Sequence, residues 1–399
     1  MALRKKRLRD LDPAGKRLFV RVDFNVPLKD GRVADDTRIE AALPTLRWIL
    51  ERGGAVVGAS HLGRPKGRVV EELRMEPVAA CLQELLSGHE VRAVRDIAGP
   101  EARAAAAELG PGQVLLLENL RFEPGETAND PEFAARLAAL GEAFVQDAFG
   151  TCHRAHASTA GVPGLLQPAV AGLLLEKELE AFRLVFEEPR RPLVAVIGGA
   201  KVSDKILVLE NLLEGVDEML IGGGMAYTFL KAQSIAVGSS LVEAERVDTA
   251  LQILKKAEEL GVKLHLPRDH VAADRFAPDA ATRIIGPHVP EGWMGLDIGP
   301  ETREAWTKIL QEAGTVVWNG PMGVFEMEAF REGTAAIARA LAASSCLSVV
   351  GGGDSVAAVK LVGAAEAVDH LSTGGGAFLA MLEGRELPGI SALSDADPA

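Results

Sequence analysis

The sequence has few cysteines, no long uninterrupted apolar run and no apolar segment behind its basic start. Its three cysteines, Cys81, Cys152 and Cys346, form no CxxC pair, which argues against a disulfide framework and favours a reducing compartment, by default the cytoplasm. The longest uncharged stretch, 157–175, is broken by two prolines and three glycines, which would interrupt a membrane-spanning helix. Because Arg4–Arg7 is followed by acidic residues, we expect neither a secretory signal nor a membrane partner.

Positive charge is also in deficit. The chain has 43 Lys and Arg against 56 Asp and Glu, a net charge of −13, so we expect no nucleic-acid partner and no anionic membrane partner. Hydrophobic residues at 48% and charged residues at 25% are typical of a soluble globular protein. A length of 399 residues predicts two or three domains, each able to bury a core.

Short β-type runs recur along the chain, and each is followed by a longer helical pattern. The runs are 18–24, 55–60, 114–117 and 143–145 in the first half, and 193–197, 219–221, 263–266, 315–318 and 347–350 in the second. Nearly continuous apolar strands that alternate with helices indicate parallel sheets covered on both faces. The sequence therefore predicts the α/β class, with two doubly wound parallel-sheet (Rossmann-like) domains.

Residues 173–186 lie between the two halves and carry apolar side chains at helical spacing, which predicts one amphipathic helix that ends before Pro189 and Pro192. This helix is either a stiff connection between two lobes or an ordinary core helix of one domain, and its pattern favours neither. We expect one domain over 1–172, the connecting helix over 173–188 and a second domain over 189–386.

Basic and polar residues follow the strands of the first half. They lie in the segments Asp23–Pro27, Asp35–Arg38, His61–Pro65, Glu118–Phe122 and Asp147–His156. Ligands of open parallel sheets bind beyond the carboxyl ends of the strands, and guanidinium groups match the oxygens of carboxylates and phosphates. A single arginine of this kind is usually a solvated surface charge, but the shared placement predicts a site for a small polyanion. His153 and His156 have no third ligand at zinc-like spacing, so we expect no metal there.

Glycine-rich segments follow the strands of the second half. They are Gly198–Lys205, Gly222–Met225, Gly351–Ser355 and Ser372–Gly376. Glycines allow close approach of a ligand, and a helix that begins just afterwards directs N–H groups at phosphate oxygens; the alternative is that they only form tight turns. No G-x-x-x-x-G-K-[ST] loop and no G-x-G-x-x-G fingerprint occurs, which disfavours a Walker NTPase and a standard dinucleotide fold.

Three charged residues beside these glycines have specific expected roles. Lys201 and Lys205 are four residues apart, so we expect them to face the same way and to reach adjoining phosphates. Asp354 at a helix start is either an N-cap or a ligand of nucleotide-bound Mg²⁺. Beside three glycines we favour the metal.

In its motifs and their order the chain resembles the phosphoglycerate kinase family from nearly its first residue to its last. The likeness is carried by Arg21–Pro27, Asp36–Arg38, Ser60–Pro65, Glu118–Phe122, Asp147–Gly150, His153–His156, Gly198–Lys205, Gly222–Ala226, Trp293–Asp297, Trp318–Glu326 and Gly351–Asp354. The resemblance implies the reversible transfer of the 1-phosphoryl group of 1,3-bisphosphoglycerate to Mg-ADP, which gives 3-phosphoglycerate and ATP in glycolysis. It also implies a cytoplasmic monomer.

The resemblance further implies two sites, one in each domain. The phosphoglycerate site in 1–172 would consist of Asp23, Phe24, Asn25, Arg38, His61, Leu62, Gly63, Arg64, Arg121 and Arg154. The nucleotide site in 189–386 would consist of Lys205, Gly295, Glu326, Gly352, Gly353, Asp354 and Ser355, with Glu326 on the ribose and Asp354 on magnesium. Arg38, Lys201, Gly374 and Gly375 would surround the transferred phosphoryl group, and the C-terminal segment 387–399 would return to the first domain.

The chain departs from the family pattern at four positions. Cys152 stands for a usual Ala, Gln146 for a usual Asn, Met327 for a usual Trp and Ser355 for a more usual Thr. The first two lie beside the substrate arginines, where packing and thiol reactivity are in question. None of the four removes a charged group that phosphoryl transfer needs.

Phosphoryl transfer needs positioning and cations rather than a covalent nucleophile. Two sites on different halves predict direct in-line transfer after a hinge-bending closure that excludes water. One rival is an NAD-dependent oxidoreductase, which the missing glycine fingerprint disfavours. The other is a catalytically silent nucleotide- and anion-binding protein, which the presence of Arg38, Lys201, Lys205 and Asp354 disfavours.

Overall fold

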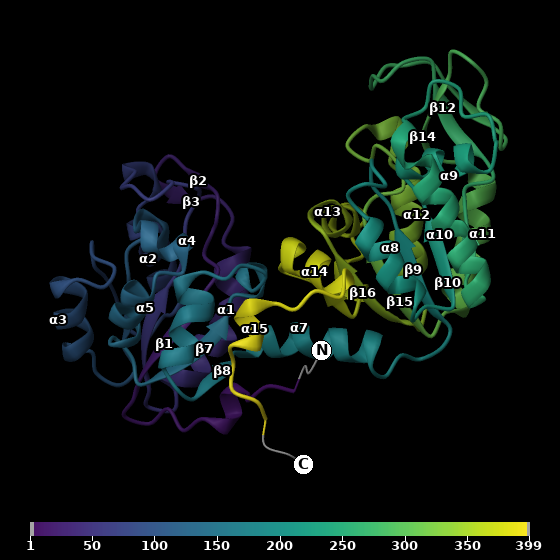
Figure 1. The fold of residues 1–399 in the computed structure, drawn as a ribbon. Helices are drawn as coiled ribbons and strands as arrows, with labels where there is room; N and C mark the ends of the chain where they lie inside the picture. The colour runs from purple at the N-terminus through teal and green to yellow at the C-terminus, as the bar shows by residue number, and fades with distance from the viewer. Residues whose placement is uncertain (1–3, 397–399) are drawn as a thin grey trace. The chain divides into compact units, whose positions relative to one another are not determined.

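The structure, a computed structural model, describes residues 4–396. The chain forms two compact units (Figure 1). Unit 1 comprises the residues up to Glu180 together with those from Glu386 onward, and unit 2 comprises Ala181–Arg385. Among residues 4–396, no helix is both long enough and apolar enough to cross a membrane.

Unit 1 is built on a six-stranded parallel sheet with the order β5-β6-β4-β1-β7-β8. Its strands are β1 (Arg17–Val22), β4 (Ala55–Ala59), β5 (Val91–Ala93), β6 (Val114–Leu116), β7 (Ala143–Asp147) and β8 (Ala169–Ala171). Its helices are α1 (Thr37–Leu50), α2 (Glu76–Leu85), α3 (Pro100–Glu108), α4 (Pro124–Ala128), α5 (Pro131–Ala138), α6 (Val162–Leu165) and α15 (Pro388–Ser391). Strands β1 and β7 are neighbours in this sheet. The connection after β1 leads to β4 on one side of the pair, and the connection after β7 leads to β8 on the other. Ligands of open parallel sheets bind where two neighbouring loops diverge in this way.

Helix α1 shows how the local sequence places a functional side chain. The Asp35 carboxylate accepts hydrogen bonds from the backbone N–H and the hydroxyl of Thr37, at 2.9 and 2.6 Å, which fixes the start of the helix. Ile39 and Leu46 are among the apolar residues that α1 buries against the sheet. Arg38, in the first turn, is therefore left exposed beside the loop after β1.

Unit 2 repeats the architecture with the strand order β11-β10-β9-β15-β16-β17, again all parallel. Its strands are β9 (Leu193–Ile197), β10 (Glu218–Ile221), β11 (Lys263–His265), β15 (Thr315–Asn319), β16 (Leu347–Gly351) and β17 (His370–Leu371). Its helices are α8 (Ile206–Leu213), α9 (Met225–Ala232), α10 (Val247–Leu260), α11 (Pro300–Glu312), α12 (Glu332–Ala342), α13 (Gly353–Leu361) and α14 (Gly375–Leu382). This is the doubly wound order, and its switch point lies between β9 and β15. The predicted α/β class with two doubly wound parallel sheets is confirmed.

Two small antiparallel sheets were not predicted. Unit 2 contains the sheet β13-β12-β14, formed by Thr282–Ile285, His270–Ala273 and Met294–Ile298, and unit 1 contains the hairpin of β2 (Leu28–Lys29) and β3 (Arg32–Val33). The residues of β13 are mostly exposed, so they show no apolar run. The edge strands β5, β8 and β17 were not predicted either, and the other strands of the two large sheets differ from the predicted runs by at most two residues at either end.

Helix α7 spans Leu173–Phe186, as the apolar spacing predicts. Its first N–H groups are held by unit 1, because Leu173 donates to the Thr45 hydroxyl at 2.8 Å and Leu174 donates to the Asp147 carboxylate at 2.9 Å. The division between the two units falls inside this helix, after Glu180.

Candidate functional site

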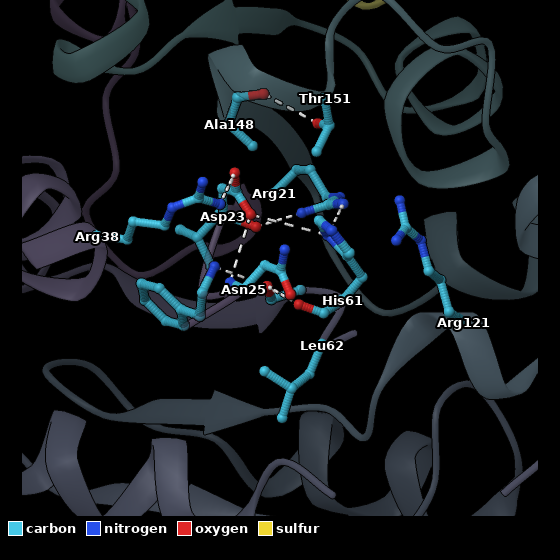
Figure 2. A network of polar contacts seen from close by, with 12 residues as sticks. Arg21, Asp23, Asn25, Arg38, His61, Leu62, Arg121, Ala148 and Thr151 are labelled. Carbon is cyan, nitrogen blue, oxygen red and sulfur yellow. Dashed lines mark hydrogen bonds and ion pairs between the residues drawn. The ribbon is translucent and has the colours of Figure 1, made fainter. Parts of the chain in front are cut away.

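The loop after β1 brings Asp23, Asn25 and Arg38 together (Figure 2). Nη1 of Arg38 donates to Oδ2 of Asp23 at 2.9 Å, and Nδ1 of His61 lies 3.8 Å from the other carboxylate oxygen. The amide oxygen of Asn25 accepts the backbone N–H of Gly63 at 2.8 Å. The loops after β1 and β4 are thus joined directly at one edge of the sheet.

Two of the predicted site residues contribute backbone rather than side chain. Phe24 and Leu62 are each only 1% exposed, and both side chains belong to the apolar core of unit 1. The N–H of Phe24 donates to the Ser60 hydroxyl at 2.9 Å, which in turn donates to the carbonyl of His61 at 3.1 Å. Their role is to anchor the polar loop on the core.

Asn119 is a residue of the candidate site that the sequence pattern did not single out. Its amide oxygen accepts the N–H groups of Leu62 and Arg121, both at 3.1 Å, and its amide nitrogen donates to the carbonyls of Leu62 and Leu73 at 2.7 and 2.9 Å. It therefore ties the loop after β6 to the loop after β4. Its position inside the predicted Glu118–Phe122 segment was the one signal that could have identified it.

Arginines crowd this edge of unit 1. Nη1 of Arg121 donates to the carbonyl of Gly63 at 2.8 Å, and Nε of Arg154 contacts Nε2 of His153 at 3.1 Å. Burial, followed by repulsion from Arg154 and Arg21, lowers the pKa of Arg121 to about 10. Cations that repel one another in this way favour the binding of an anion between them.

His61 lies within the same cluster and is buried (Figure 2). Burial, followed by the nearby charges of Arg21, Arg121 and Arg154, lowers its pKa well below the ordinary histidine value. The imidazole is therefore neutral around pH 7. Arg64 follows the left-handed turn at Gly63, where φ is 62°, and it is exposed; no residue within 4–396 forms an ion pair with it.

In unit 2, several predicted glycines are explained by close packing of loops. A Cβ at Gly198 would collide with the carbonyl of Pro321, and one at Gly223, where φ is 69°, would lie 2.6 Å from the N of Gly199. The loops after β9, β10 and β15 meet at these glycines. For this group, the packing of neighbouring loops accounts for the glycines without a ligand.

The glycines at the starts of α13 and α14 have a different environment. A Cβ at Gly353 would meet nothing within 4 Å, and one at Gly375 would lie 3.7 Å from both the Cα of Gly352 and the N of Gly353. Two helix N-termini therefore lie side by side, with N–H groups that no side chain of the described residues caps. Such paired N-termini suit phosphate oxygens.

Lys201 and Lys205 do not lie on a helix, which corrects the expectation based on their spacing. Both precede α8, which begins at Ile206, and they differ in environment. Lys201 is exposed, whereas Nζ of Lys205 is partly buried and donates to Oδ1 of Asn319. Burial lowers the pKa of Lys205.

Asn319, at the end of β15, is a second residue that the sequence analysis missed as a site residue. Besides accepting from Lys205, it donates from Nδ2 to the carbonyl of Gly351 at 2.8 Å. The hydroxyl of Ser355 accepts the N–H of Gly320 at 2.7 Å. These bonds join the loop after β15 to the start of α13.

Asp354 is the second residue of α13, and its environment decides between its two expected roles. The N-cap is Gly352, and no side chain caps the helix, so the capping alternative is wrong. Asp354 is exposed, and within residues 4–396 no group forms a hydrogen bond or an ion pair with its carboxylate. A single free carboxylate fits Mg²⁺, which takes one or two carboxylates and completes its shell with phosphates and water.

Gly295 and Glu326, the remaining nucleotide candidates, lie on other parts of unit 2. Gly295 is in β14, its N–H donates to the Ser240 hydroxyl at 2.9 Å, and a Cβ there would collide with the hydroxyl of Tyr227. Glu326 is exposed in the loop after β15. Gly295 is therefore required by its close packing against Tyr227, and Glu326 provides an accessible acceptor.

Cys152 and Gln146, the two departures from the family pattern beside the substrate arginines, are both buried. Burial raises the pKa of the Cys152 thiol, so this thiol is poorly reactive at neutral pH. Within residues 4–396, both polar atoms of the Gln146 side chain lack a hydrogen-bond partner.

Comparisons with known proteins agree along nearly the whole chain. The family model described as phosphoglycerate kinase matches residues 8–385. The phosphoglycerate kinase of Moorella thermoacetica is 58% identical, covering 97% of this chain and 98% of its own length, and that of a Roseiflexus species is 57% identical, covering 98% and 100%. Among solved structures, the phosphoglycerate kinase of Coxiella burnetii has a TM-score of 0.91 at 44% identity, covering 97% of this chain and 98% of its own. That of Pyrococcus horikoshii has a TM-score of 0.82 at 36% identity with the same coverage.

Proposed function

The chain belongs to the phosphoglycerate kinase family, and we propose that unit 1 binds the phosphoglycerate and unit 2 binds the nucleotide. As a member, it is a phosphotransferase of glycolysis that acts on a carboxyl group as acceptor. This assignment of one ligand to each unit rests on a single observation. Cationic side chains gather in unit 1, whereas paired helix N-termini lie in unit 2.

The proposed phosphoglycerate site consists of the polar edge of unit 1. Its members are Asp23, Asn25, Arg38, His61, Arg64, Arg121 and Arg154, with the backbone of Phe24, Leu62 and Gly63. The arginines bind the carboxylate and phosphate oxygens of 3-phosphoglycerate or 1,3-bisphosphoglycerate. Asp23 would repel a phosphate, so we assign it to the substrate hydroxyl and to holding Arg38, with which it is paired at 2.9 Å.

The proposed nucleotide site consists of Lys205, Gly295, Glu326, Gly352, Gly353, Asp354 and Ser355. The N-termini of α13 and α14 and the ammonium of Lys205 bind the phosphates of ADP or ATP. Glu326 accepts from the ribose hydroxyls. Asp354 is the residue that would hold Mg²⁺, which when bound neutralises charge on the nucleotide phosphates.

We propose direct in-line transfer between the two bound substrates after hinge-bending closure of the two units. The transition state is loose, with charge spread over the equatorial oxygens of the phosphoryl group. Arg38, Lys201 and the N–H groups at Gly374 and Gly375 surround that charge and stabilise it. Closure excludes water, which would otherwise hydrolyse the acyl phosphate. Helix α7 is the proposed connection that transmits this motion.

We further propose that the enzyme is a cytoplasmic monomer. All three cysteines are unpaired thiols, which supports a reducing compartment. The family likeness supports the monomer, and sedimentation equilibrium of the purified protein tests it.

The experiment that tests the function is phosphorus NMR of the protein with Mg-ATP and 3-phosphoglycerate, with hydrazine added to trap the acyl phosphate. We expect formation of ADP that requires both 3-phosphoglycerate and magnesium, and that Lys201→Ala abolishes. Tight binding of both ligands without turnover would mean a silent binding protein. ADP formation without 3-phosphoglycerate would mean an ATPase.

A further inference from the structure

A buried arginine, Arg21, lies directly behind the cationic side chains of the proposed phosphoglycerate site and has no role in the function proposed so far. Arg21, near the end of β1, is 1% exposed, and its guanidinium points at His61 (Figure 2). Its Nη2 lies 3.2 Å from Nδ1 of His61, its Nε donates to the Ser158 hydroxyl at 2.9 Å, and its Nη1 donates to the carbonyl of Val22. All three nitrogens of the side chain are thus engaged.

The Ser158 hydroxyl connects Arg21 to a fully buried carboxylate. It donates to Oε1 of Glu126 at 2.6 Å, and the Ser158 N–H donates to Oε2 at 3.0 Å. Because the hydroxyl has only one proton and Glu126 receives it, the hydroxyl must present a lone pair to Nε of Arg21. Glu126 is 0% exposed and lies on α4, far from β1 in sequence. A buried charge of this kind is tolerated only with a partner.

Glu126 is the main counter-charge for Arg21. Burial lowers the pKa of Arg21, and attraction to Glu126 and then to Asp23 opposes that effect. The guanidinium therefore stays charged behind the site, and Ser158 fixes its orientation. The bonds from Glu126 through Ser158 to Arg21 form one chain in which each donor is polarised by the next.

The last contact in this chain decides which nitrogen of His61 carries the proton. A guanidinium has donors only, so a hydrogen bond from Arg21 requires Nδ1 of His61 to be unprotonated. Asp23 lies 3.8 Å from the same nitrogen and would favour the opposite state. The other charged groups that face His61 are Arg121, Arg154 and Arg38. All three disfavour the charged form of the ring, in which both nitrogens are protonated.

With Nδ1 accepting, the proton of the neutral ring must be on Nε2. Within residues 4–396, Nε2 has no hydrogen-bond partner. We propose that Glu126 and Ser158 are positioning residues of the anion site, which act through Arg21 to hold His61 in the tautomer whose Nε2–H donates to the bound phosphoglycerate. This inference rests on the proposed assignment of His61 to the phosphoglycerate site.

The test measures the tautomer of His61 directly, by long-range ¹H–¹⁵N NMR of protein labelled with ¹⁵N-histidine and free of ligand at pH 7. The His61 signals are assigned with His61→Gln. We expect the wild type to show a neutral ring protonated on Nε2. Ser158→Ala, which breaks the chain, should populate the form protonated on Nδ1. Glu126→Gln keeps the shape but removes the charge and should act in the same direction.

Calorimetry on the same variants supplies the functional result. One lost hydrogen bond to an anion should raise the Kd for 3-phosphoglycerate by about tenfold, while the Kd for Mg-ATP stays within about twofold. The matched control is Ser348→Ala in unit 2. Ser348 is also a buried serine whose hydroxyl is bound to a carboxylate, that of Asp369 at 2.8 Å. It should lose comparable stability without changing the His61 spectrum or the phosphoglycerate affinity.

The outcomes separate the two proposals. A wild-type ring protonated on Nδ1 would overturn the positioning role, and so would unchanged His61 signals in both variants that still bind phosphoglycerate. An equal loss of phosphoglycerate affinity in Ser348→Ala would reduce the role of Ser158 to general stability and would overturn it as well. A wild type that does not bind 3-phosphoglycerate at all would overturn the proposed function, and with it the ligand assigned to His61.

Discussion

Oδ1 of Asp147 accepts the backbone N–H groups of Leu174 and Leu175, at 2.9 and 3.3 Å, so the last residue of β7 caps the start of α7. The same strand leads into the segment that carries Arg154. One buried carboxyl group therefore joins the anion-binding loop, residues 148–156, to helix α7, which we propose as the connection between the units. Burial raises its pKa to about 7, against the opposing effect of the hydrogen bonds from Thr45, Leu175 and Leu174.

This raised pKa predicts a pH-dependent stability. An acid whose pKa is higher in the folded state binds more protons when folded, so its contribution to the free energy of unfolding falls as pH rises. Between about pH 4 and about pH 7, the wild type should lose on the order of a few kcal/mol relative to Asp147→Asn, which cannot ionise. Urea unfolding of both proteins at several pH values measures this difference. Parallel profiles would mean that Asp147 is not the titrating group.

A second prediction concerns the charges around the transferred phosphoryl group. Lys201→Ala or Arg38→Ala should lower kcat by at least about a hundredfold, far more than it weakens substrate binding, because each is assigned to charge that develops in the transition state. Steady-state kinetics with both substrates varied separates the two parameters. Arg103→Ala on α3 removes an exposed arginine outside the site and serves as the control. Unchanged kcat with a raised KM would assign Lys201 or Arg38 to ground-state binding instead.

The sequence allowed the architecture and the motif segments of the two candidate sites to be predicted, and the omissions have physical causes. Motif segments mark Asp23, His61 and Arg121 because the chemistry needs charged and polar residues at strand ends. Asn119 and Asn319 bridge loops that are adjacent only in the folded sheet, so no spacing along the chain indicates them. The two lysines before α8 were expected to face the same way because they are four residues apart, but that interval has this meaning only within a helix.

The loop-bridging role of Asn319 gives a third prediction. Asn319→Leu keeps the side-chain volume but removes both the acceptor for Lys205 and the donor to the carbonyl of Gly351. We expect the Kd for Mg-ATP to rise by about tenfold, since Lys205 loses its fixed position. The Kd for 3-phosphoglycerate should be unchanged by calorimetry. A loss of affinity for both ligands would point to general destabilisation, which thermal unfolding of the variant would show.

A fourth prediction separates the two sites. Arg154→Ala or Arg64→Ala removes a cation from the edge of unit 1, so each should weaken 3-phosphoglycerate binding by roughly tenfold to a hundredfold. Mg-ATP binding should persist, because the proposed nucleotide residues are all in unit 2. Calorimetry with each ligand alone checks both statements. Lost nucleotide affinity would contradict the assignment of the two ligands to different units.

The C-terminal segment contacts the anion-binding loop at a glycine, and this contact gives the last prediction. The N–H of Gly389 donates to the carbonyl of Cys152 at 2.9 Å. A Cβ at Gly389 would lie 2.9 Å from the Cα of Cys152 and 3.2 Å from its sulfur. Backbone cannot yield as a flexible side chain can, so Gly389→Ala should cost about 1–3 kcal/mol of stability through overpacking.

The added methyl group of Gly389→Ala would push on the loop that contains Cys152. This loop also carries Arg154, two residues further on, so the substitution should in addition raise the Kd for 3-phosphoglycerate. The matched control is Gly164→Ala in α6, where a Cβ would meet nothing within 4 Å and alanine is the better helix former. This control should leave stability and affinity unchanged or slightly improved. If Gly389→Ala lowers stability without weakening phosphoglycerate binding, the C-terminal segment stabilises unit 1 but does not position Arg154. Urea unfolding and calorimetry on the same preparations distinguish these results.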